Sequence, residues 1–395
     1  MKRLALLAFA LAFAATLFAE ETVKVVSCLP RTGSAKAQTD TIVNGIQMAL
    51  EEAGYKAGDF KIAYEDWDDA TAAAGDWEQF QVANNADRAV KDADVMVVIG
   101  HYNSGAAKIS MPILNKADIL MISPANTWPG LTKPGKGEAQ EPEKYRPTGK
   151  VNYTRVVPAD DLQGPLGADW AKSMGVKTVF ILDDRSVYGK GIADLFEKEC
   201  EEIGLEVGGH EGIDPKQQEY KALMTKIKGS APDLVYFGGT TQSNGGQILK
   251  DSMAVGLTCK FMVPDGCFED AFITSAGAEN VNDRCFVTFG GMPPDQLTGK
   301  GKEFVERYVK KFGTKPQGYA VYGYEAGQVA VEAIKRAGKK DRNAIREACL
   351  SIKDFDGALG KWSFDENGDT TLKTMSGQVV KNGKFEFVTL LGGER

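Results

Sequence analysis

Short apolar runs rich in β-branched residues alternate along the chain with longer amphipathic stretches. The apolar runs predict buried strands at Val23–Val26, Ile62–Tyr64, Val95–Ile99, Ile119–Ile122, Val179–Leu182, Leu234–Phe237 and Phe286–Phe289. Helical periodicity covers residues 40–53, 72–91, 105–116, 161–174, 190–203, 217–228, 245–255, 300–312, 320–337 and 342–351. Strands that alternate with helices predict an α/β fold with doubly wound, Rossmann-like parallel sheets covered on both faces.

Two segments depart from this alternation. The last forty residues carry short extended runs at Trp362–Phe364, Gly377–Val380 and Phe385–Val388, and Asn382-Gly383 predicts a type I′ hairpin between the last two. Residues 133–150 are rich in Pro, Gly, Lys and Glu and form a loop that is long for a compact domain. Because loops tolerate added length, we interpret this loop as a surface insertion and not as a functional flap.

The N-terminus has the pattern of an export signal. Lys2 and Arg3 precede an apolar run from Leu4 to Phe18, and Ala19 offers a cleavage point before two acidic residues. The run is too short to span a bilayer, and no Cys follows it directly. Residues 1–19 are therefore expected to be a removed signal peptide, which places the protein in the periplasm or elsewhere outside the cytoplasm.

Length and charge narrow the classes further. Removing residues 1–19 would leave 376 residues, which is too long for one ordinary domain and predicts two. That chain would hold 45 basic and 54 acidic residues, a net charge of −9. An acidic balance opposes nucleic-acid binding and anionic membrane surfaces.

Sequence signals of catalysis, cofactors and metals are lacking. The six cysteines form no C-x-x-C pair, and the only histidines are His101 and His210, so no metal site is expected. Residues 130–136 resemble a phosphate-binding loop, but Gly137 stands where Ser or Thr is required, and no G-x-G-x-x-G follows a strand. We expect no cofactor and no enzyme activity. The cysteines could form disulfides outside the cytoplasm or remain buried thiols: Cys28, Cys200, Cys259, Cys267, Cys285 and Cys349.

Two strand-to-helix junctions carry polar residues that could bind a ligand. They span residues 97–105 and 120–127, and ligands of parallel sheets bind beyond the carboxyl ends of the strands. Helix N–H groups at the first junction favour an anion such as a carboxylate, and the hydroxyls of Ser104 and Thr127 could add hydrogen bonds. Alternatively, Ser104 caps its helix and Thr127 only shapes a turn.

Two further junctions lie in the middle of the chain. Residues 181–189 contain Tyr188, which could cover a ligand, and residues 261–266 contain Asp265, which could meet an ammonium group. The alternatives are a half-buried surface tyrosine and an acidic turn residue.

With these motifs in order, the chain resembles the type I periplasmic solute-binding proteins, specifically the leucine/isoleucine/valine-binding branch that serves ABC importers. The resemblance rests on the order and spacing of short motifs over about 370 residues. They are Leu29–Gly33, Gly100-His101 with Ser104, Met121–Thr127, Arg155–Gly164, Asp184–Gly191, Tyr236–Gly239 and Tyr322–Ala326.

The resemblance implies a fold of two doubly wound lobes joined by three crossovers, with the ligand in the cleft between them. Lobe 1 would take residues 22–156 and 291–357, and lobe 2 residues 157–290 and 358–395. Ser104, Ala125 and Thr127 would hold the carboxylate and amino group of an amino acid. Asp265 would bind the ammonium group, and Tyr188 would cover the ligand.

The sequence also departs from that branch. Gln38 and Thr240 stand where the branch has aromatic residues, and Asn103 replaces a cysteine of the branch's disulfide. We include Asn103, Gln38, Thr240 and Tyr324 among the expected ligand contacts. These polar replacements argue against strict leucine-like specificity.

We therefore expect a monomeric substrate-binding protein that hands an amino acid to the membrane permease of an ABC importer. Two alternatives stay open. The ligand could be an amide, urea or an aromatic acid, or the protein could be the ligand-sensing domain of a receptor. A ligand without an amino group would leave Asp265 buried and unpaired.

Overall fold

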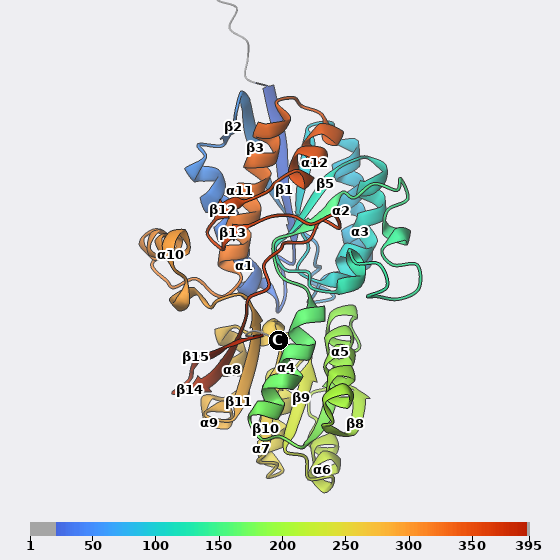
Figure 1. The fold of residues 1–395 in the computed structure, drawn as a ribbon, viewed down its shortest axis with the longest axis vertical. Helices are drawn as coiled ribbons and strands as arrows, with labels where there is room; N and C mark the ends of the chain where they lie inside the picture. Colours follow the sequence, from blue (N-terminus) through green and yellow to red (C-terminus); the bar gives the residue numbers. More distant parts are fainter. Residues whose placement is uncertain (1–20, 393–395) are drawn as a thin grey trace, which may run out of the picture.

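Two lobes, one above the other, make up the computed structural model, which describes residues 21–392 (Figure 1). The expected signal peptide lies outside these residues. The first lobe is built on a six-stranded sheet with the order β2-β3-β1-β4-β5-β6. Its strands are parallel except for the β2–β3 pair. They span Glu21–Leu29 (β1), Lys56–Ala57 (β2), Phe60–Asp68 (β3), Val95–Gly100 (β4), Leu120–Ser123 (β5) and Tyr153–Arg155 (β6).

Helices from two separate parts of the chain belong to this lobe. They are α1 (Lys36–Glu52), α2 (Gln79–Lys91), α3 (Ser104–Lys116), α10 (Gly299–Phe312), α11 (Ala320–Ala337) and α12 (Arg342–Leu350). Helices α1 and α11 pack closely because glycines lie at their contact: a Cβ atom on Gly45 would lie 2.2 Å from the carbonyl oxygen of Ala320. This packing ties residues beyond position 320 to the N-terminal strands.

The second lobe contains a seven-stranded sheet with the order β15-β14-β11-β10-β9-β7-β8. Its strands are β7 (Thr178–Asp183), β8 (Glu206–Gly212), β9 (Leu234–Gly238), β10 (Lys260–Val263), β11 (Cys285–Gly290), β14 (Met375–Lys381) and β15 (Lys384–Leu391). Its helices are α4 (Asp160–Ser173), α5 (Val187–Ile203), α6 (Lys221–Gly229), α7 (Gly245–Ala254), α8 (Asp270–Ala276) and α9 (Ala278–Val281). The predicted hairpin joins β14 to β15, and Asn382 and Gly383 both have the positive φ that a type I′ turn requires.

The chain crosses between the lobes three times, after β6, after β11 and before β14. The third crossover comes later than residue 357, where the resemblance places it. Trp362 donates a hydrogen bond to Glu325 of α11, and Asp369 pairs with Arg155 at the end of β6. Residues up to Asp369 therefore pack with the first lobe.

One predicted helix begins late. The pattern predicts a helix over 72–91, but α2 starts only at Gln79. Gly75 has a φ of +69°, and the Glu78 side chain caps the helix by accepting hydrogen bonds from the Phe80 and Gln81 N–H groups. Residues 72–78 thus form a loop whose last residues reach the space between the lobes.

All six cysteines are free thiols in this structure, so the disulfides that an even count allows are not formed. None of the helices in residues 21–392 is long and apolar enough to cross a membrane.

A buried acid in the first lobe predicts a pH-dependent stability. Glu325 is fully buried, and burial raises the pKa of its carboxyl group from 4.5 to about 7 although Trp362 and Ala358 donate to it. A raised folded-state pKa gives stability that is fully present below about pH 4.5 and is lost as the pH rises to about 7. The loss from this group should reach roughly 3 kcal/mol.

Urea unfolding of the protein and of Glu325→Gln between pH 4 and pH 8 checks this expectation. Subtracting the two curves isolates the residue from other titrating groups, and the difference should grow with pH up to about 7 and then level off. A difference that is flat across this range would contradict the assignment.

Candidate ligand-binding cleft

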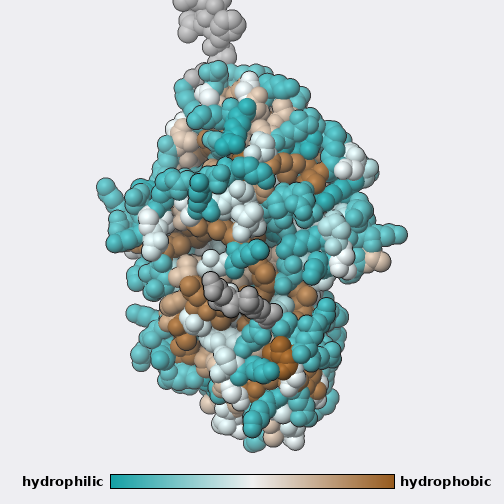
Figure 2. All heavy atoms as spheres, viewed as in Figure 1, coloured by the Kyte–Doolittle hydropathy of each residue, from teal (hydrophilic) through white to brown (hydrophobic). Residues whose placement is uncertain are grey.

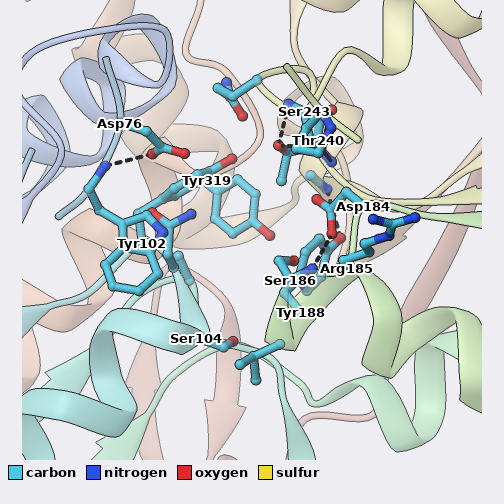
Figure 3. Close-up of a pocket in the computed structure, with 18 residues that line it drawn as sticks. Asp76, Tyr102, Ser104, Asp184, Arg185, Ser186, Tyr188, Thr240, Ser243 and Tyr319 are labelled. Atoms are coloured by element: carbon cyan, nitrogen blue, oxygen red, sulfur yellow. Dashed lines mark hydrogen bonds between the residues drawn. The ribbon is translucent and has the colours of Figure 1, made fainter. Parts of the chain in front are cut away.

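A cavity of about 410 Å³ lies where the lobes meet. Figure 2 shows that the outer surface is mainly hydrophilic and that apolar residues come to the surface around the waist between the lobes. Both lobes contribute to the cavity wall, and Figure 3 shows their polar side chains facing one another. The wall consists of Asp76, Trp77, Tyr102, Asn103, Ser104, Gly105, Ala125, Asp184, Arg185, Ser186, Val187, Tyr188, Pro215, Thr240, Gln242, Ser243, Gly266 and Tyr319.

One wall of the cavity is the N-terminus of α3. Strand β4 ends at Gly100, Asn103 is the N-cap, and Ser104 is the first helical residue. Asn103, and not Ser104, is therefore the N-cap residue, and because its side chain makes no capping hydrogen bond, the N–H groups of the first turn are not capped by a side chain. Asn103, Ser104 and Gly105 all line the cavity, and this end of a helix attracts a carboxylate.

The second predicted junction contributes only in part. Ala125 lines the cavity next to the α3 terminus. Thr127 is 1% exposed and is absent from the wall, and its hydroxyl lies beside the buried Asp160. The structure therefore places Thr127 behind the site, because the turn after Ala125 directs its side chain into the protein.

The facing wall belongs to the second lobe and begins at the end of β7. Ser186 caps α5 by accepting a hydrogen bond from the Gly189 N–H at 2.8 Å, and Asp184 accepts one from the Ser186 N–H at 2.9 Å. Burial raises the pKa of Asp184. Tyr188 follows on the first turn of α5 and lines the cavity.

Asp265 lies directly behind this wall. It is fully buried and does not itself line the cavity. Its carboxylate accepts hydrogen bonds from the hydroxyl of Tyr188 at 2.5 Å, from the hydroxyl of Tyr319, and from the Gln163 amide at 3.2 Å. Two tyrosines therefore lie between Asp265 and the cavity. The expected direct contact of the Asp265 carboxylate with a ligand is not what the structure shows.

A second buried acid, Asp160, lies close enough to Asp265 for the two carboxyl groups to affect each other. Asp160 begins α4, and burial together with the neighbouring Asp265 raises its pKa well above the usual value. Only the Thr127 hydroxyl lies beside the Asp160 carboxyl group as a donor, whereas Asp265 receives three donors. Burial raises the pKa of Asp265 as well, but its three donors favour the ionised form, so a negative charge is better stabilised on Asp265 than on Asp160.

Of the four other residues predicted to contact the ligand, two line the cavity and two do not. Asn103 and Thr240 line the cavity. Gln38 is fully buried beneath it, and its amide oxygen accepts a hydrogen bond from the cavity residue Tyr102. Tyr324 lies elsewhere, with its hydroxyl on Glu52 and Arg307, because α11 turns it away from the cleft.

Several cavity residues are absent from the sequence prediction. Asp76 and Trp77 come from the loop that the pattern assigned to a helix, and Tyr319 precedes α11 in a distant segment. Tyr319 belongs to the first lobe and bonds Asp265 of the second, so it also bridges the lobes. The aromatic stretch 319–324 is the only signal that could have pointed to it.

Two groups of side chains in residues 21–392 have the composition of a metal site, and both lie outside the cavity. In the first, the ring of His101 lies between Asp69 at 2.6 Å and Ser110 at 2.9 Å. In the second, the ring of His210 lies between Glu197 at 2.7 Å and Asp183 at 3.1 Å. Both ring nitrogens are thus already hydrogen-bonded in each group, which is a sufficient structural role for these histidines.

The long loop over 133–150 has a structural role that a passive insertion would lack. Its Glu141 accepts hydrogen bonds from the indole of Trp128 at 2.9 Å and from the Tyr145 hydroxyl at 2.5 Å, and pairs with Lys108 of α3 at 2.8 Å. The Trp128 ring lies against Gly191 of α5, where a Cβ atom would lie 2.4 Å from the ring. The loop therefore fixes a tryptophan that reaches from the first lobe to the second.

This contact predicts an effect of Gly191→Ala. The contact exists only when the lobes are together, and overpacking costs about 1–3 kcal/mol, so ligand affinity should fall about five- to hundredfold. Alanine in an open helix is no worse than glycine, so the unfolding free energy without ligand should hold or rise slightly. Calorimetry and urea unfolding measure the two quantities, and unchanged affinity would exclude the contact from lobe closure.

The fold and the cavity define a two-lobed binding protein with a cavity between doubly wound lobes. The family described as periplasmic binding protein matches residues 22–384, and the chain belongs to this family. It is a solute-binding protein of the type that serves ABC transporters, and not an enzyme.

Individual relatives and solved structures agree with this assignment. The chain is 30% identical to "Leu/Ile/Val-binding protein homolog 2" of Brucella abortus, with 91% of this chain and 90% of the relative covered. It is 28% identical to an "Amino acid binding protein" of Pseudomonas aeruginosa, covering 86% and 85%. The structure of the leucine binding protein LivK from Thermotoga maritima matches with a TM-score of 0.83 and 28% identity, covering 93% of this chain and 98% of that one.

Proposed function

We propose that this protein captures an α-amino acid outside the cytoplasm and delivers it to the membrane permease of an ABC importer. The observation that carries the proposal is the pairing of opposite electrostatic environments across one cavity. The α3 N-terminus, with Ser104 and Ala125, offers positive potential on the first lobe. The second lobe places the ionised Asp265 behind the hydroxyls of Tyr188 and Tyr319.

An amino acid matches both ends of this cavity. Its carboxylate would accept hydrogen bonds from Ser104 and the first turn of α3. Its ammonium group would donate to the hydroxyl oxygens of Tyr188 and Tyr319, whose protons are directed to Asp265. Burying both charges is costly unless each is matched, so both walls are needed at once. Relatives named for leucine, isoleucine and valine binding support the same ligand class.

Export fits this role. Residues 1–19 would direct the chain across the membrane, and the family name refers to the periplasm. Mass determination of the secreted mature protein tests the expected cleavage after Ala19, and retention of residues 1–19 would contradict it.

A second ligand class deserves a place in the same experiment. The rings of Tyr102 and Tyr319 meet edge to face at 6.3 Å in the cavity wall, and together with Trp77 they could pack against an aromatic acid. One solved structure of the same fold, from R. palustris, contains benzoate. Such a ligand would have no ammonium group to bind at Tyr188 and Tyr319 in front of Asp265.

Calorimetry with a panel of amino acids and aromatic acids tests the proposal. We expect saturable one-to-one binding of at least one amino acid and recovery of the ligand unchanged. Mass spectrometry of small molecules released by denaturation identifies what the protein carries from its host. Binding of benzoate with no binding of any amino acid would overturn the proposal in favour of the second class.

A further inference from the structure

Carboxylates face the cavity from both lobes. Asp76 comes from the first-lobe loop 72–78, and Asp184 comes from the end of β7 in the second lobe. Figure 3 shows the two on opposite sides of the cavity. Burial raises the pKa of Asp76, and the charges of Asp69 and, to a smaller extent, Asp184 raise it further.

The cavity wall holds little positive charge to offset these acids. Among the described residues that line the cavity, Arg185 is the only basic one, and it is exposed. Its guanidinium donates to the Gly212 carbonyl at 2.6 Å, and in Figure 3 it points away from Asp76. Arg185 is therefore used outside the cavity and leaves the interior with a negative balance.

Hydrogen-bond acceptors are also in excess. The amide nitrogen of Gln242 donates to Glu269 at 2.8 Å, which fixes the amide so that its oxygen is the free end. That oxygen is buried and has no partner, although Gln242 lines the cavity. Asp76 accepts one hydrogen bond, from the adjacent Trp77 N–H at 2.7 Å. A ligand that fills this part of the cavity must bring donors, because unpaired buried acceptors are costly.

We propose that the cavity selects an amino acid with a cationic side chain, of the lysine or ornithine class, and that Asp76 determines this specificity. The inference rests on the proposed function, in which the α-carboxylate and α-ammonium occupy the other two walls. Closing the lobes brings Asp76 and Asp184 together, and a side-chain ammonium between them turns repulsion into attraction. The methylenes of such a side chain would pack on Trp77 and Tyr102, both of which line the cavity.

Calorimetry with L-lysine, L-ornithine and L-norleucine tests the proposal on the full mature protein at pH 7.5 after removal of bound ligand. Norleucine has the four-carbon side chain of lysine without its terminal ammonium group, so the comparison isolates the contribution of that ammonium. We expect lysine or ornithine to bind at least tenfold more tightly than norleucine. In Asp76→Asn this preference should fall at least tenfold, because lysine and ornithine lose a partner whereas norleucine no longer closes the lobes on two facing carboxylates.

The matched control is Asp87→Asn, which removes an exposed acid on α2 of the same lobe and should leave every affinity unchanged. Norleucine binding as tightly as both basic amino acids would overturn the proposal and leave the proposed function intact. An equal loss for all three ligands in Asp76→Asn would place the α-ammonium at Asp76 and also overturn it. Failure of every amino acid to bind the unaltered protein would instead contradict the proposed function itself.

Discussion

Replacing Asp265 by asparagine should weaken the binding of an amino acid by about 2–5 kcal/mol, which is roughly thirtyfold or more. The change keeps the size of the side chain and removes the negative charge behind Tyr188 and Tyr319. Without that charge the tyrosine hydroxyls no longer point their protons away from the cavity, and the ligand's ammonium loses the field that favours it. Calorimetry on the variant measures the effect.

The same substitution should also lower the stability of the ligand-free protein. Asp265 is fully buried and accepts hydrogen bonds from two tyrosines and Gln163, whereas an asparagine would direct an N–H group at one of these donors. This expectation differs from that for a hydrated acid in an open cleft, whose loss would leave stability unchanged. Urea unfolding of ligand-free protein measures it.

Tyr322→Phe is the matched control, because it removes a buried tyrosine hydroxyl outside the cavity that bonds the Gly290 carbonyl. It should cost stability and leave affinity nearly normal. Tyr319→Phe should lower affinity, since its hydroxyl belongs to the proposed ammonium site. Normal affinity in Asp265→Asn with reduced stability would show that Asp265 only holds the tyrosines in place.

The sequence predicts well which strand-to-helix junctions border the cavity, for a physical reason. Parallel strands and following helices have strong periodic signals, and their carboxyl ends converge on one edge, so Ser104, Ala125 and Tyr188 could be placed at the cavity from the strand-to-helix junctions and the family resemblance. The direction of a side chain within a turn carries no such signal. Thr127 and Ala125 are two residues apart, yet only Ala125 faces the cavity.

The missed residues show where periodicity misleads. An alanine-rich stretch before Asp76 has the composition of a helix. Gly75 lies in the left-handed region and Glu78 caps the following helix, so the helix begins only after Glu78. Tyr324 is predicted at the cleft, but its place on α11 directs its hydroxyl to Glu52. Tyr319 reaches Asp265 across 54 positions in the sequence, which local patterns cannot show.

The buried ion pair at the first and third crossovers should be the most important polar contact for stability. Arg155 is fully buried and donates to Asp369 at 2.7 Å and 3.2 Å through two nitrogens. It also donates to the Trp128 carbonyl at 2.8 Å. Replacing Arg155 by methionine would leave the buried Asp369 carboxylate with only the Thr132 hydroxyl at 3.0 Å and Lys133 at 3.8 Å, so we expect a loss of about 3 kcal/mol in the free energy of unfolding.

A double-mutant cycle with Asp369→Leu separates the pair from the packing around it. Because a buried pair often contributes little compared with apolar residues of similar size, the double variant should recover much of the loss seen in Arg155→Met. The exposed pair Lys190–Asp194 on α5 provides a control, and Lys190→Met there should cost at most about 0.5 kcal/mol. If Arg155→Met costs no more than this control, the Arg155–Asp369 pair does not stabilise the crossovers, and other contacts must hold them.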